Sequence, residues 1–134
     1  MKFRTNNAQD FVIGGFIPGA SGFDALLVGY FAGRDLIYAA KVRGGFVPRD
    51  KAALVPKLKR LKSSACPLAN LPEPKGGRWG ESLTAEKMKE CVWVNPELVC
   101  QVSFIEWTSA GHLRHCSFAG MRQDKAARDV VRET

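Results

Sequence analysis

The chain has 134 residues, of which 46% are hydrophobic and 25% are charged, a composition typical of a soluble globular protein. This length suits one domain with its own core, and no apolar run approaches the roughly 20 residues that span a bilayer. The formal net charge of +7 favours a polyanionic partner, with nucleic acid ahead of an anionic membrane surface.

The first half of the chain predicts three consecutive strands. Asp10–Pro18 is rich in β-branched and aromatic residues, and its Gly14-Gly15 pair predicts a bulge or a sharp bend. The second strand, Phe23–Phe31, is joined by a hairpin turn to the third, Leu36–Phe46. Alternation in the third strand predicts one face of Leu36, Tyr38, Ala40 and Val42, opposite a face with Lys41 and Arg43.

A helix is predicted over Pro48–Lys62, because leucines recur there at helical spacing and basic residues cover the other side. Pro56 is expected to kink this helix or to divide it in two. The segment 63–90 is rich in proline and glycine and predicts a long surface loop or an insertion, with one or two helical turns after Thr84.

Two further strands and a short helix complete the pattern. The strands are Glu97–Thr108 and Leu113–Phe118, and Asp124 is expected to cap a helix from Lys125 to about Arg132. Three strands, a helix and two strands follow the order of an OB-fold, a five-stranded Greek-key barrel. We therefore predict an all-β OB-fold with a short C-terminal helix, and keep an open α+β sandwich as the alternative.

The cysteines and histidines do not predict a metal site. Zinc ligands cluster at short spacings, and no C-x-x-C pair occurs here. We expect no metal ligands, and instead free buried thiols in a reducing cytoplasm, since the polar N-terminus shows no signal peptide. The residues concerned are Cys66, Cys91, Cys100, Cys116, His112 and His115.

Two segments resemble the ATP-dependent DNA ligases. Leu113–Lys125, "LRHCSFAGMRQDK", resembles motif VI, a signature close to R-x-P-x-F-x-G-x-R-x-D-K. Lys2–Phe31 resembles the junction where motif V meets a first barrel strand of the type Q-E-F-V-I-G-G. The strand before motif VI is similar as well. The likeness is greatest to the bacterial ligases of double-strand-break end joining, and it covers nearly the whole chain except 63–90.

The resemblance implies a single OB-fold domain over 1–134, the C-terminal domain of a parent ligase. Residues 1–8 would be the remnant of the motif V strand and its linker, and 113–132 the motif VI region. Cys116 replaces the usual proline, and Gln123 a common glutamate. The K-x-D-G segment with the adenylated lysine has no counterpart, so we expect an enzyme only as part of the parent, inactive as an isolated chain.

In the family, the OB domain closes over the nucleotide, and motif VI supplies cations for the pyrophosphate that leaves ATP. Carried over, the catalytic candidates are Arg114, Arg122 and Lys125, with Asp124 orienting them. Lys2 and Arg4, at the motif V lysine positions, would join Arg122 and Lys125 in contacting nucleotide phosphates. ATP and Mg²⁺ are therefore implied through the parent enzyme, without stable binding by this domain alone.

The resemblance also implies that the OB domain next contacts the minor groove of nicked DNA through phosphate-binding cations. The tryptophans Trp93 and Trp107 are expected to pack in the core, because a duplex offers no unstacked bases. The implied partners are nicked double-stranded DNA and the nucleotidyltransferase domain of the same ligase, for a cytoplasmic monomer without membrane contact. The DNA-binding candidates are Lys41, Arg43, Arg49 and Lys51.

Two alternatives stay open. A free-standing OB module for single-stranded nucleic acid would expose aromatic residues on its second and third strands, and Tyr30, Phe31 and Tyr38 leave this possible. Such a module has no reason to carry R-x-D-K after its last strand. The OB domain of an RNA ligase or a capping enzyme is the second alternative, against which the F-V-I-G-G strand argues.

Overall fold

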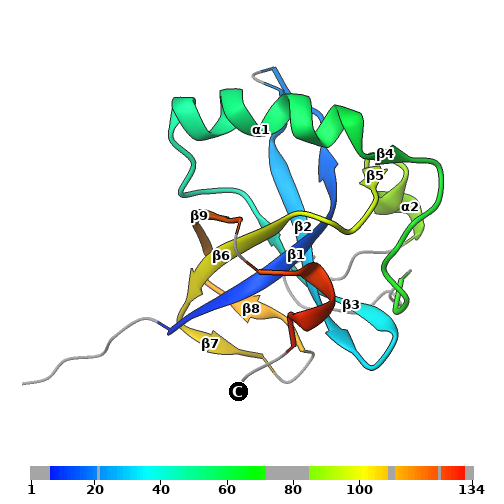
Figure 1. The fold of residues 1–134 in the computed structure, drawn as a ribbon, viewed down its shortest axis with the longest axis vertical. Coiled ribbons are helices and arrows are strands. Elements are labelled where there is room, and N and C mark those ends of the chain that lie inside the picture. The colour runs from blue at the N-terminus through cyan, green and yellow to red at the C-terminus, as the bar shows by residue number, and fades with distance from the viewer. Residues whose placement is uncertain (1–6, 21, 72–84, 109–110, 124, 132–134) are drawn as a thin grey trace, which may run out of the picture.

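The fold is mostly strand, with one long helix (Figure 1). In this computed structural model, residues 7–20, 22–71, 85–108, 111–123 and 125–131 are described. Along the chain the elements are β1 (Asn7–Ile17), β2 (Ala25–Ala32), β3 (Asp35–Val42), α1 (Pro48–Arg60), β4 (Lys62–Ser63), α2 (Ala85–Met88), β5 (Val92–Val94), β6 (Val99–Phe104), β7 (Glu106–Trp107), β8 (Leu113–Arg114), β9 (Ser117–Arg122) and the 3₁₀ turn η2 (Ala127–Asp129).

Strand β1 organises the sheet, because it pairs with β2 along one edge and with β6 and then β5 along the other. Its pairing with β2 shifts register between Ile13 and Gly15, so the predicted glycine bulge is confirmed. Strand β3 pairs with β2, and β9 pairs with β6. The five longest strands therefore run in the order β3-β2-β1-β6-β9, with α1 between the third and the fourth of them along the chain, as in an OB-fold. The predicted fourth strand, Glu97–Thr108, is divided into β6 and β7, and the predicted fifth, Leu113–Phe118, covers β8 and only the start of β9.

The first and last strands of this order, β3 and β9, approach each other without pairing. Among the described residues, no strand pairing joins β3 to β9, and the backbone N–H of Phe118 donates to the carbonyl of Gly44 at 2.9 Å. Helix α1 lies across one end of the strands, while β7 and β8 form a separate two-stranded sheet toward the other end (Figure 1). Leu54 and Leu58 of α1 are buried against the core.

The predicted alternation of β3 is wrong beyond Tyr38. The β2–β3 pairing shifts register at Val28, opposite Ala40, and Gly29, opposite Tyr38, so Ala39 is an extra residue. A one-residue bulge moves all later side chains to the opposite face. Tyr38 therefore lies in a smaller outer cluster with Leu36, whereas Ala40 and Val42 lie in the main core.

Helix α1 begins with Pro48 and continues through Pro56 to Arg60. The predicted division of the helix at Pro56 is therefore wrong. Proline at position 56 removes the hydrogen bond to the carbonyl of Ala52, yet both residues are exposed, so water can solvate that carbonyl. The buried leucines on the other side hold the helix against the strands.

The C-terminal helix predicted from Lys125 to about Arg132 is wrong. The described residues there form only the three-residue turn η2, preceded by an extended Ala126 without a side-chain cap. Val130 is fully buried, and its carbonyl accepts a hydrogen bond from the backbone N–H of Phe31 at 2.8 Å. Tertiary packing of Val130 against β2 thus prevails over local helix propensity. The predicted cap, Asp124, lies outside the described residues.

The predicted loop or insertion contains structured parts. Leu68 is buried, forms a bridge to Leu36 and lies against Gly14, while Asn70 Oδ1 accepts a hydrogen bond from the backbone N–H of Tyr38 at 2.8 Å. The short helical turn predicted after Thr84 is confirmed as α2. Residues 72–84 lie outside the described part of the chain.

Candidate phosphate-binding site

A bulge in β9 determines where Arg122 points. Gln101 of β6 lies opposite Gly120, and Val102 lies opposite Phe118, so β9 has one extra residue, Ala119. Phe118 is buried in the main core, and Met121 packs against that same core. Arg122 therefore faces outward, because the extra residue reverses the alternation that would otherwise direct it inward. Gly120 takes φ +141° at this bulge, which favours glycine.

Arg122 and Lys125 converge on one carboxylate, that of Asp10 on β1. Arg122 Nη1 lies 3.1 Å from Asp10 Oδ1 and 3.3 Å from Oδ2, and Lys125 Nζ lies 3.2 Å from Oδ2. The Asp10 side chain is 8% exposed, whereas those of Arg122 and Lys125 are 37% and 28% exposed. One buried negative charge thus lies beneath two partly exposed positive charges, and the group carries a net charge of about +1.

Sequence reasoning missed Asp10, although a signal was present. An acidic residue directly before the apolar run "FVIGG" cannot be explained by core packing, and the ligase pattern has glutamate at this place. Buried carboxylates require a charged or hydrogen-bonding partner. The partner was not evident, because Arg122 lies 112 positions further along the chain.

Arg114 is held in a different part of the fold. It lies on β8, in the two-stranded sheet, and its Nη1 pairs with Glu106 Oε2 at 2.9 Å. Both side chains are more than half exposed, so this pair contributes little to stability. The structure thus joins two of the three predicted motif VI cations and leaves Arg114 with another carboxylate. Lys2 and Arg4 lie outside the described residues.

Two of the four DNA-binding candidates are exposed: Arg43, directly after β3, and Arg49, in the first turn of α1. Lys41 is half-buried on the outer side of β3. Burial lowers the pKa of Lys41 below its ordinary value, and the nearby charges of Arg43 and Lys87 lower it further. The two arginines are therefore better placed than Lys41 for contact with an external polyanion.

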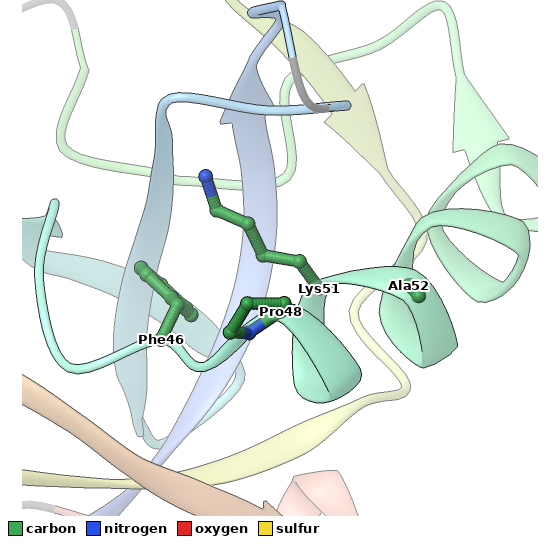
Figure 2. A pocket seen from close by; sticks show the side chains of 4 residues that line it. All are labelled: Phe46, Pro48, Lys51 and Ala52. Carbon is green, nitrogen blue, oxygen red and sulfur yellow. The ribbon is translucent and has the colours of Figure 1, made fainter.

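The fourth candidate, Lys51, lies against aromatic rings at the start of α1. Its Nζ is 5.2 Å from the ring centre of Phe23 and 6.0 Å from that of Phe46, within the range of cation–π attraction. Figure 2 shows the Lys51 side chain extended from α1, with Phe46 and Pro48 beside it. These three residues and Ala52 line a depression of about 340 Å³.

The tryptophans pack as predicted. The ring centre of Trp107 lies 6.0 Å from that of Phe11, 5.7 Å from that of Tyr30 and 5.7 Å from that of Phe104. Trp93 packs against the outer cluster. Tyr38 is 3% exposed, and Tyr30 and Phe31 are partly buried. The second and third strands therefore do not present the three aromatic residues as an exposed stacking platform.

All four cysteines are free. The expectation of buried thiols holds only for Cys100, because Cys66, Cys91 and Cys116 are partly exposed. The described residues contain no group of three or more histidine, cysteine, aspartate or glutamate side chains arranged for a metal. No helix in the described part of the chain is long and apolar enough to cross a membrane.

Because of the buried Cys100 thiol, the free energy of unfolding is expected to fall in alkaline solution. Burial, with a smaller effect of Asp10, raises the pKa of Cys100 from 9.0 to about 12, so the unfolded chain loses this proton first as the pH rises. The stabilisation is complete below pH 9 and is lost between pH 9 and about 12. Between pH 8 and pH 10, the free energy of unfolding, measured in urea under reducing conditions, should fall by about 1 kcal/mol more than that of the Cys100→Ala variant. Parallel pH dependence of the two proteins would contradict the assignment.

The fold and the outward-facing cations define an OB-fold domain with a basic site at the end of its last strand. Residues 19–125 match the family described as the ATP dependent DNA ligase C terminal region. The chain belongs to this family.

Curated relatives cover the whole chain. It is 35% identical over 137 aligned residues to the multifunctional non-homologous end joining DNA repair protein LigD of Mycobacterium tuberculosis strain H37Rv, covering 99% of this chain and 17% of that protein. It is 32% identical to the LigD of Pseudomonas aeruginosa, covering 99% of this chain and 15% of that protein. The chain thus spans about a sixth of the length of the curated relatives it matches.

Solved structures agree with the fold. The crystal structure of the ligase domain from M. tuberculosis LigD matches with a TM-score of 0.82 and 35% identity, over 96% of this chain and 39% of that one. A mycobacterial DNA ligase D complexed with ATP and MES matches with a TM-score of 0.76 and 35% identity, over 95% of this chain and 38% of that one.

Proposed function

We propose that this chain is the C-terminal OB domain of an ATP-dependent DNA ligase that seals nicks during end-joining repair. The observation that carries the proposal is the convergence of Arg122 and Lys125, at the R-x-D-K positions of motif VI, on the carboxylate of Asp10. Similarity to end-joining proteins over 99% of this chain supports it. We propose further that 1–134 is one OB domain that acts as a single copy, in which 1–8 is the motif V remnant, 63–90 an insertion and 113–132 the motif VI region.

The proposed reaction is the transfer of AMP to a lysine in the nucleotidyltransferase domain. The neutral lysine Nζ forms a bond to the α-phosphorus of ATP and loses a proton to solvent, while the bond from that phosphorus to the bridging oxygen breaks and pyrophosphate leaves with the electron pair. The leaving group gains negative charge, which cations at fixed positions stabilise. In our proposal Arg122 supplies guanidinium donors and Lys125 a point charge. Mg²⁺ bound to the nucleotide would neutralise further phosphate charge.

Arg114 and Asp124 have secondary roles in this proposal. Arg114 would exchange its exposed partner, Glu106, for a phosphate when the domain closes, because an exposed ion pair is worth at most about 1 kcal/mol. Asp124 would orient Lys125. Lys2 and Arg4 would contact the nucleotide from the motif V side.

The proposal is tested by complementation. The part of the M. tuberculosis ligase domain that this chain does not match would be incubated with ATP, with and without the 134-residue chain, while lysine adenylation is followed. We expect the chain to increase the adenylation rate, because it supplies the cations that the truncated partner lacks. Absence of any increase, together with retained binding to single-stranded DNA, would instead support a free-standing nucleic-acid-binding module.

We also propose that Arg43 and Arg49 contact phosphates of nicked duplex DNA, with smaller contributions from Lys41 and Lys51. Replacing both arginines by alanine should weaken binding at every sequence and reduce the slope of log K against log salt by about 0.9 for each phosphate that the protein no longer neutralises. Fluorescence anisotropy at several salt concentrations measures this. The matched control is Arg34→Ala, which removes an exposed arginine from the β2–β3 turn. An unchanged slope in the double variant would place the DNA elsewhere.

A further inference from the structure

The Asp10 carboxylate is unusual because it is nearly closed to solvent while both of its partners remain accessible. Its side chain is 8% exposed, and the two cations that lie on it are 37% and 28% exposed. The carboxylate therefore supports Arg122 and Lys125 from beneath, on the side away from an incoming ligand. A buried ionised carboxylate needs such partners, so all three charges depend on one another.

The carboxylate is also fixed by the most connected part of the sheet. Asp10 lies opposite Gln101 of β6, and Gln101 lies opposite Gly120 of β9, so three paired strands connect Asp10 to the segment that carries Arg122. The β9 bulge places Arg122 on the same outer face as Asp10. Lys125 follows β9, after the end of the regular pairing, and has no strand of its own to hold it.

We propose that Asp10 is a positioning residue for adenylation: it holds the head groups of Arg122 and Lys125 side by side, so that one polyphosphate meets both. This inference rests on the proposed function and names a residue in another strand on which the motif VI cations depend. Without a shared counterion, two neighbouring cations repel each other and their long side chains spread over many rotamers. Groups that are ordered before the reaction stabilise developing charge without further reorganisation.

The test is Asp10→Asn, which keeps the size of the side chain and one hydrogen-bond acceptor but removes the charge. In the complementation assay, the rate of lysine adenylation at saturating ATP should fall by about tenfold to a hundredfold, the range known for removal of residues that hold metal ligands in place. Sealing of a nick that already carries AMP should stay within about twofold, because no pyrophosphate leaves in that step. A purely structural defect would reduce both steps. Asp10→Glu should restore most of the rate, since it restores the charge.

The control is Asp35→Asn, the same substitution at the exposed first residue of β3, which should leave both steps unchanged. An unchanged or faster adenylation step in Asp10→Asn would overturn the proposal, because the carboxylate would then be irrelevant or would compete with the phosphates. Loss of both steps, with a lowered unfolding temperature, would overturn it too and assign Asp10 to stability alone. If Arg122→Ala does not slow adenylation, the proposed function itself fails, whatever Asp10→Asn does.

Discussion

Replacing Arg122 by alanine is expected to slow lysine adenylation by about 10²–10³-fold in the complementation assay. The reason is electrostatic: a donor aimed at charge that develops on the leaving group acts mainly in the transition state, and removal of one such donor costs about this factor. The effect should appear in the rate at saturating ATP rather than in the concentration of ATP needed for half-maximal rate. Sealing of a pre-adenylated nick should be nearly unaffected.

The Arg122→Lys variant separates charge from geometry. Lysine keeps the positive charge but replaces a planar guanidinium with a single ammonium, so it should recover only part of the rate. Lys125→Ala should also slow adenylation, while Arg34→Ala, in the exposed β2–β3 turn, should not. Equal rates for Arg122→Ala and the unchanged chain would refute the role of Arg122, and a similar loss in Arg34→Ala would indicate a nonspecific effect of net charge.

The order of the strands along the chain, and the position of α1 among them, could be predicted from the sequence, because both depend on the local spacing of hydrophobic residues. In β6, for example, Cys100, Val102 and Phe104 occupy alternate positions and all lie in the main core. Helix α1 follows from leucines at helical spacing, of which Leu54 and Leu58 are buried.

The errors arose where tertiary contacts override local pattern. Alternation cannot reveal that Ala39 is an extra residue, because the bulge depends on pairing with β2. The end of the chain looks helical by composition, yet burial of Val130 and its hydrogen bond to Phe31 draw it along β2 instead.

Only the cations of the candidate site could be predicted from the sequence, because their carboxylate partner depends on tertiary contacts. Arg122 and Lys125 lie in one short segment that resembles a known motif, so they could be named without a structure. Their shared counterion could not be named, because Asp10 belongs to β1 and meets them across β6. Contacts between distant strands require the register of every strand between them, and here that register includes the β9 bulge.

Gly45→Ala is expected to destabilise the fold by about 2–4 kcal/mol, because it combines backbone strain with an overlap against β9. Gly45 takes φ +89°, a conformation that favours glycine, and an added Cβ would overlap the backbone of Phe118 and the hydroxyl of Ser117. This contact lies beside the hydrogen bond from Phe118 to Gly44, where the two ends of the strand order meet. Chemical denaturation monitored by circular dichroism measures the change.

Gly44→Ala provides the matched control one residue away. A Cβ at Gly44 meets nothing within 4 Å. This substitution should therefore change the free energy of unfolding by less than about 1 kcal/mol. Equal stability of the two variants would mean that close approach to β9 does not limit residue 45. A selective loss in Gly45→Ala should also slow adenylation, because the strand that is pushed away, β9, is the one that carries Arg122.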